Sequence, residues 1–215
     1  MNYLNLVNNV LRRLREDEVT SVSDSVYATM IGDIVNDAKR QVEDAWNWTA
    51  LRTTITVPTV ASTQTYSLTD SAHRASITDA TNDTSNWWMR KESQQWMRRQ
   101  ALVRTSPNGA PFAYSVEAPD SNGDTQVKLY PTPDAVYSLS FNVVQREADL
   151  SDDADTSSVP HMPVIHLAVA MAASEKGETG GMASQELYGM AKRSLADAIS
   201  RDAGFVETDT VWYPV

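Results

Sequence analysis

The hydrophobic periodicity of this chain changes twice, and this order of patterns constrains the fold more than any other feature. Apolar residues recur every three or four positions up to about residue 51, alternate in short β-branched runs to about residue 148, and return to helical spacing after Pro160. This order predicts an α+β fold, a helical bundle of N-terminal and C-terminal helices with an inserted antiparallel β region. The expected parts are a helical domain of residues 1–51 and 159–203, an inserted β-rich region of residues 52–148, and a C-terminal docking tail of residues 204–215.

Four helices are expected in the helical part. Leu4, Val7, Leu11 and Leu14 form one stripe on a helix over residues 3–15. A longer stripe predicts a helix over about residues 25–51, capped by Ser23 or Asp24, with one of Trp46 and Trp48 in the core and the other at a neighbouring surface. After Pro160, the nearly continuous apolar run at 162–176 predicts a buried helix, and spaced apolar residues predict another at 187–203.

Alternating and β-branched runs predict several short strands with turns between them. The expected strands are residues 53–57, with 63–68 as its hairpin partner, and 87–91, 112–116, 126–130 and 137–147. A short helix capped by Ser93, with Trp96 inward, is expected between two of these strands. Residues 69–86 are rich in small polar side chains and predict a loop, whereas residues 149–158 predict an acidic, solvated linker.

No group of residues in the sequence predicts catalysis, a cofactor or a metal. The chain has no cysteine, which excludes disulfides and thiolate chemistry. His161 and His166 are five residues apart in the sequence, whereas a spacing of four residues suits two zinc ligands on one helix. His73 has no evident partner. The acidic segments lack EF-hand spacing, and no phosphate loop or nucleophile elbow is present. We therefore expect no enzyme.

One basic and aromatic segment is a candidate interface in an acidic chain. The net charge of -10 argues against a generic DNA-binding surface. Basic residues nevertheless alternate with tryptophans between residues 87 and 104, which permits three interpretations: single-strand or sugar binding by stacking, a solvated helix face with core tryptophans, or a protein interface. We favour a protein interface, and its candidate residues are Trp87, Trp88, Arg98 and Arg99.

The C-terminal tail carries the second group of candidate interface residues. It contains Phe205, Val211, Trp212 and Tyr213, and it is too short to form a core by itself. Exposed aromatic residues at a terminus dock into a partner or fold back onto the chain's own helices, and both alternatives stay open. No apolar run is long enough for a transmembrane helix and no signal core follows the N-terminus, so we expect no membrane partner and an intracellular or intracellularly assembled protein.

The order of the segments resembles the head-to-tail adaptor (connector, or neck) proteins of tailed bacteriophages, especially those of short-tailed phages. The first shared segments are the opening helix and the long helix that ends in Ala45-Trp46-Asn47-Trp48. The strand and turn motifs that follow are Leu51 to Val57, Thr65 to Leu68, Gly109-Ala110-Pro111-Phe112-Ala113-Tyr114, Leu129-Tyr130-Pro131-Thr132-Pro133 and Tyr137-Ser138-Leu139. The last is the pair of helices after Pro160, so the resemblance spans nearly the whole chain.

The resemblance implies a virion structural protein of the neck region, assembled in the host cytoplasm. Such adaptors form a homo-oligomeric ring, expected here as a dodecamer, below the portal protein. The ring extends the channel through which DNA passes without sequence-specific contacts, and it provides a platform for the tail or nozzle protein. Two alternatives are a tail-tube or tail-completion protein, and a β-rich glycan-binding or nucleic-acid-binding module that stacks ligands on Trp87, Trp88 and Trp96.

Overall fold

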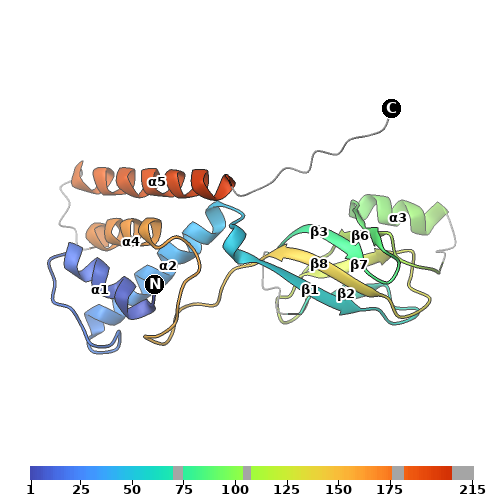
Figure 1. Ribbon diagram of the computed structural model, residues 1–215, viewed down its shortest axis with the longest axis horizontal. Helices are drawn as coiled ribbons and strands as arrows, with labels where there is room; N and C mark the ends of the chain where they lie inside the picture. The colour runs from blue at the N-terminus through green and yellow to red at the C-terminus, as the bar shows by residue number, and fades with distance from the viewer. Residues whose placement is uncertain (70–74, 104–107, 176–181, 205–215) are drawn as a thin grey trace. The chain divides into compact units, whose positions relative to one another are not determined.

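The computed structural model describes residues 1–69, 75–103, 108–175 and 182–204 (Figure 1). Its helices and sheets confirm the predicted α+β class. The chain separates into two compact units: a helical unit, made of Met1–Leu51 and the residues from Glu147 onward, and a β unit, Arg52–Arg146. The helical unit therefore combines segments from both ends of the chain, and the β unit is an insertion between them.

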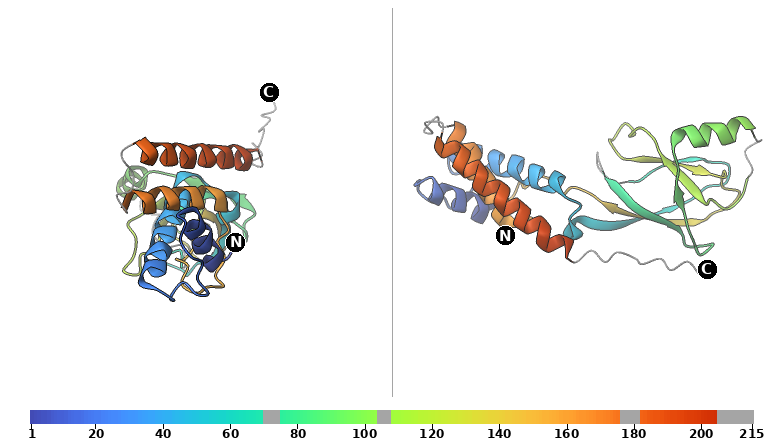
Figure 2. Two further views of the ribbon diagram at one scale, coloured as in Figure 1. Left: turned by 90° about the vertical axis from the view of Figure 1, so that its left-hand side faces the viewer. Right: turned by 90° about the horizontal axis from the view of Figure 1, so that it is seen from above.

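Among its described residues, the helical unit contains four α-helices, which pack against one another. They are α1 (Tyr3–Arg13), α2 (Val26–Ala45), α4 (His161–Glu175) and α5 (Met182–Ala203). α4 is buried along most of its surface, as its continuous apolar sequence predicts, and α5 lies alongside it (Figures 1 and 2). The fully buried side chains of this core include Leu6, Val7, Val10, Leu11, Ile31, Val35, Ala38 and Ile165.

The long helix begins and ends differently from the prediction. Its N-cap is Ser25, whose side chain accepts a hydrogen bond from the N–H of Ala28, whereas the carboxylate of Asp24 accepts the N–H groups of Thr20 and Ser21. The helix ends at Ala45 and not at residue 51, because Trp46 adopts an extended backbone and a short 3₁₀ helix, η1 (Thr49–Leu51), follows.

The two tryptophans at this helix end take different environments, as predicted. Trp48 is buried, and its indole N–H donates to the carbonyl oxygen of Val42 over 2.7 Å. Trp46 is half-buried and donates to the carboxylate of Asp202 in α5 over 2.9 Å. The same carboxylate accepts the hydroxyl of Thr49 over 2.5 Å. Asp202 therefore joins the end of α5 to the segment that leads out of the helical unit.

The described residues of the β unit form two four-stranded sheets and one helix. The first sheet has the order β1 (Arg52–Pro58), β8 (Ser138–Val144), β3 (Ser76–Asn82), β4 (Trp87–Trp88). The second has the order β2 (Thr65–Ser67), β7 (Gln126–Tyr130), β6 (Ala113–Val116), β5 (Arg90–Lys91), and α3 (Gln94–Val103) follows β5. All pairs are antiparallel except the parallel pair of β5 and β6.

The predicted hairpin between the first two strands is wrong. β1 pairs with β8, in a register that sets Ile55 opposite Phe141 and Val57 opposite Leu139, so that apolar side chains share one face. β2 pairs instead with β7, with Tyr66 opposite Val127. Pairing with distant strands is favoured because it continues the apolar face of each sheet.

Two further predictions in the β unit need correction. The segment 69–86 is not a loop throughout, because it contains β3, whose pairing with β8 shifts register between Ile77 and Asp79. This bulge places Ile77 and Ala80 in the core at a spacing of three, which hides the alternation. The run 87–91 is also interrupted: Met89 is buried, and the residues before and after it belong to different sheets.

The core of the β unit lies on the apolar faces of its strands. The rings of Tyr114 and Phe141 meet edge to face with centroids 5.6 Å apart, and burial raises the pKa of Tyr114 to about 12. Ser93 caps α3 as predicted, accepting the N–H of Trp96. Trp96 is half-buried and packs edge to face on Tyr130, 5.2 Å between centroids.

Candidate interaction surfaces

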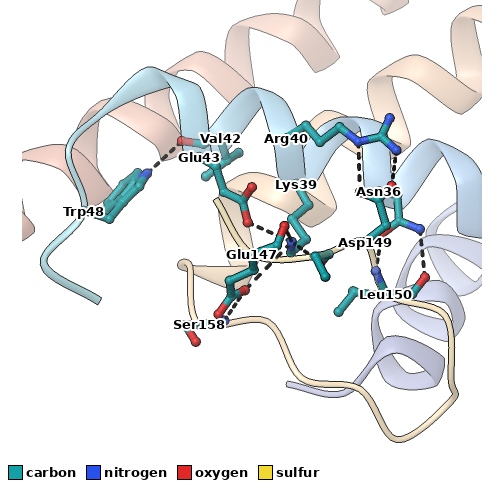
Figure 3. A network of polar contacts seen from close by, with 11 residues as sticks. Asn36, Lys39, Arg40, Val42, Glu43, Trp48, Glu147, Asp149, Leu150 and Ser158 are labelled. Atoms are coloured by element: carbon teal, nitrogen blue, oxygen red, sulfur yellow. Dashed lines mark hydrogen bonds and ion pairs between the residues drawn. The ribbon is translucent and has the colours of Figure 1, made fainter. Parts of the chain in front are cut away.

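The buried ammonium group of Lys39 fixes the segment that returns from the β unit onto α2 (Figure 3). Lys39 has an exposed fraction of 0%, and its Nζ atom lies 2.8 Å from Oε1 of Glu43. It also donates to the carbonyl oxygen of Ala148 over 2.9 Å and lies 3.8 Å from the carboxylate of Glu147. A buried ammonium is stable only with such partners, so the position of residues 147–148 is coupled to the charge of Lys39.

Polar contacts on both sides extend this attachment. The side-chain amide of Asn36 donates to the carbonyl oxygen of Leu150 and accepts its N–H, both over 3.0 Å. Arg40 pairs on the surface with Asp149, which raises the pKa of Arg40 (Figure 3). The acidic segment 149–158 is therefore not a solvated linker, because its backbone and carboxylates bind the helical unit.

The loop before α2 and the first residues of α1 hold the rest of this segment. The N–H of Val22 donates to the carboxylate of Asp153, and the N–H of Tyr3 donates to the carbonyl oxygen of Asp155 over 2.8 Å. Nearby Asp33, Asp149 and Asp153 add to the effect of burial in raising the pKa of Tyr3. The carboxylates of Asp149, Asp153 and Asp155 therefore serve in folding contacts within the chain.

Trp87 and Trp88 form an exposed surface on β4, at the edge of the first sheet. Trp88 has an exposed fraction of 68% and Trp87 of 41%. The indole N–H of Trp87 donates to the carbonyl oxygen of Pro111 over 3.0 Å, which holds that ring in place. A cavity of about 320 Å³ lies beside both rings, and Asp83, Asn82 and Thr81 contribute to its wall. We call this the tryptophan surface.

Three polar side chains beside the tryptophan surface, those of Thr81, Asn82 and Asp83, are already hydrogen-bonded within the chain. The carboxylate of Asp83 accepts the hydroxyl group of Ser140 over 2.5 Å, which has the larger effect in lowering the pKa of Asp83, and that of Thr81 over 2.7 Å. The side-chain amide of Asn82 donates to the carbonyl oxygen of Pro111. Because these groups have internal partners, this arrangement suits apolar contact with another protein better than hydrogen bonding to a sugar.

Arg98 and Arg99 are exposed on α3, separate in the chain from the tryptophan surface. Within the residues that the structure describes, no hydrogen bond, ion pair or cation–π contact joins these arginines to Trp87 or Trp88; the guanidinium of Arg90 instead lies 5.7 Å from the centroid of Phe112. Phe205, Val211, Trp212 and Tyr213 lie outside the described residues. The sequence-predicted interface residues therefore occupy more than one element.

Sequence reasoning missed a groove between α4 and α5, with a volume of about 460 Å³. We call it the α4–α5 groove. Two arginines, Arg193 and Arg201, line it from α5, and exposed Met162 and Met190 contribute apolar surface. Arg193, Asp197 and Arg201 recur every four positions, which places them on one helix face. That spacing was the available signal, but the sequence does not show which face of α5 meets α4.

The histidines do not form a metal site with other ligands in the described part of the chain. No group of three or more histidine, aspartate or glutamate side chains there is arranged to hold a metal ion. His161 and His166 both line the α4–α5 groove. Burial, with a smaller effect from Arg13, lowers the pKa of His166, so it is neutral at neutral pH. His73 lies outside the described residues.

The chain was also compared with known proteins. A family model with the description "SU10 adaptor protein" matches residues 1–211, which include both structural units. No curated protein matches the sequence. Among the helices of the described residues, none has the length and apolar character needed to cross a membrane.

Proposed function

We propose that the copies of this chain form a ring below the portal protein. The premise is that the chain belongs to the SU10 adaptor protein family and is a phage head-to-tail adaptor. The observation that carries this proposal is the family match itself, because it covers the helical unit and the β unit together. The ring extends the DNA channel and offers a platform for the tail or nozzle protein. We propose twelve subunits, in the neck of the virion, assembled in the host cytoplasm.

A closed ring needs two different complementary patches on each subunit. The tryptophan surface provides one, since Trp88 exposes two thirds of its area and indole rings are enriched at the centres of protein interfaces. The helical unit provides the other. Arg98 and Arg99 lie on α3, where arginine suits pairing with carboxylates of a neighbouring subunit or of the portal.

The charge of the chain suits a channel through which DNA must move. Each subunit has a net charge of -10, and a ring multiplies this charge. Acidic residues at the lumen repel the phosphate backbone, which reduces binding to DNA during passage. The C-terminal docking tail, residues 204–215, then contacts the portal through its aromatic residues Phe205, Trp212 and Tyr213.

Native mass spectrometry of the chain, alone and mixed with the portal of the same virus, tests this function. We expect one discrete addition to the portal with the mass of a ring of subunits. A chain that stays monomeric and does not bind the portal would contradict the proposal; copurification with the nozzle alone would instead support a tail-completion protein.

Two variants locate the contacts within the assembly. Deletion of residues 205–215 is expected to abolish portal binding, whereas Trp88→Ala is expected to weaken contacts between neighbouring subunits. The matched control is Val136→Ala, which removes another exposed apolar side chain of the β unit. If both Trp88→Ala and the control assemble like the unchanged chain, the tryptophan surface is not a subunit interface.

A further inference from the structure

The α4–α5 groove has the dimensions and lining of a peptide-binding site. Its volume of about 460 Å³ lies within the range of ligand sites in proteins. The side chains of Met162 and Met190 are exposed there, although they are large and apolar. Methionine and arginine both make favourable contacts with aromatic rings, through sulfur and through the guanidinium plane. The lining therefore suits an aromatic side chain.

The groove is positively charged in an acidic protein. Arg193 and Arg201 outweigh Asp197, the one acidic residue in the wall. No ion pair within the described residues engages these three side chains. A carboxylate-bearing occupant would find charged partners that are at present exposed to solvent.

The chain itself contains a segment with the complementary chemistry. Residues 205–215, Phe-Val-Glu-Thr-Asp-Thr-Val-Trp-Tyr-Pro-Val, carry two carboxylates, three aromatic rings and no basic residue. They follow directly after α5, and Arg201 in the last turn of that helix lines the groove. Gly204, after which the segment continues, is thus three residues beyond the groove wall in the chain.

The length of this segment is sufficient to fill the groove. Along α5, Met190 lies roughly 21 Å before Gly204, at about 1.5 Å per residue. Trp212 is eight residues beyond Gly204 and reaches about 26 Å in extended form. A chain that reverses at Gly204 can therefore place Trp212 beside Met190 and its carboxylates beside Arg193 and Arg201.

We propose that residues 205–213 of an isolated subunit occupy the α4–α5 groove of the same subunit, with Trp212 against Met190 and Glu207 and Asp209 near the groove arginines. This selects one of the two alternatives that the sequence leaves open for the tail. The inference concerns the subunit before assembly and does not require the ring. Docking in the groove keeps the tail of a free subunit covered. Where the tail also binds the portal, the portal must displace it from the groove.

Methyl NMR on the full-length chain tests the inference. The chain is labelled on the methionine methyl groups, and the resonances of Met162 and Met190 are compared with those of Trp212→Ala. We expect the indole ring to shift both resonances, so that Trp212→Ala moves them, while the control Trp88→Ala leaves them unchanged. A helical circular dichroism signal equal to that of the unchanged chain shows that loss of folding does not cause the shifts.

A second pair of variants tests the charge of the groove. Arg193→Gln is expected to weaken docking roughly tenfold, because it removes one charge-assisted contact. It should also move the resonances of Met162 and Met190 toward their positions in Trp212→Ala. Lys192→Gln removes the same charge from the adjacent residue, which lies outside the groove wall, and is expected to have no effect.

Three outcomes decide the proposal. Shifts that are independent of protein concentration support docking within one subunit. Shifts that grow with concentration show that the tail of a second copy occupies the groove and overturn docking within one chain. Unchanged resonances of Met162 and Met190 in Trp212→Ala show that the tail does not enter the groove at all. None of these outcomes depends on portal binding, so failure here leaves the adaptor proposal intact, and failure of portal binding leaves this inference intact.

Discussion

Replacement of Lys39 by methionine is expected to destabilise the helical unit strongly. The ammonium group is buried, lies 2.8 Å from the buried carboxylate of Glu43, and donates to the carbonyl oxygen of Ala148. Methionine has a similar length but carries no charge and cannot donate these bonds, so the variant loses the buried ion pair with Glu43 and the hydrogen bond to Ala148. Breaking a buried ion pair in this way costs about 3–5 kcal/mol of the free energy of unfolding.

Urea unfolding, followed by the helical circular dichroism signal, measures this cost. With a slope of about 2 kcal/mol per molar urea, the midpoint for Lys39→Met should fall by roughly 1.5–2.5 M. The matched control is Arg40→Met, one residue along the same helix, whose ion pair with Asp149 is exposed. Such surface pairs contribute about 0–1 kcal/mol, so the control midpoint should move little.

The double variant Lys39→Met, Glu43→Leu separates the charge from the packing. It removes both buried charges, and we expect it to recover most of the stability lost in Lys39→Met. The reasoning is refuted if Lys39→Met and Arg40→Met lower the midpoint equally, because the burial of the ammonium group would then have no energetic consequence.

Three further changes test other contacts. Gly32→Ala should lower the free energy of unfolding by about 1–3 kcal/mol in urea, because the added Cβ would overlap the hydroxyl group of Tyr3 and a methyl group of Val22. A midpoint equal to that of the unchanged chain would contradict this close packing. Asp202→Ala should cost about 1–3 kcal/mol in thermal unfolding by leaving Trp46 without its acceptor; an unaltered melting temperature would show that this anchor is dispensable. The lowered pKa of His166 means that protonation favours the unfolded chain, so the free energy of unfolding should fall as the pH decreases below about 6.5. His166→Gln should reduce this pH dependence between about pH 7 and 5. An equal pH dependence in the variant and the unchanged chain would contradict this role of His166.

Local patterns in the sequence were sufficient to predict most helices and strands. The apolar stripes of α1 and the continuous apolar run of α4 follow directly from residue spacing. The opposite environments of Trp46 and Trp48 were also predictable, because residues two apart on a helix cannot share a face.

Strand pairing and buried charges could not be predicted in the same way. The residues of β1 pair with residues 80 to 92 positions further along the chain, and several strands offer a suitable apolar face. Lys39 interrupts no pattern, and only the structure shows that the carbonyl oxygen of Ala148 lies within its reach. The α4–α5 groove depends on which faces of two helices meet, which residue spacing leaves open.

The pairing of β1 with β8 makes the β unit an exchangeable module. The chain leaves the helical unit at Arg52 and returns to it after Arg146. Because Arg52 pairs with Val144, the two connections lie on neighbouring strands about 5 Å apart. Asp202 secures the outgoing segment through Thr49, and Lys39 secures the returning one at Ala148. A recombination event at these two points could therefore replace the whole insertion without rebuilding the helical unit that carries it.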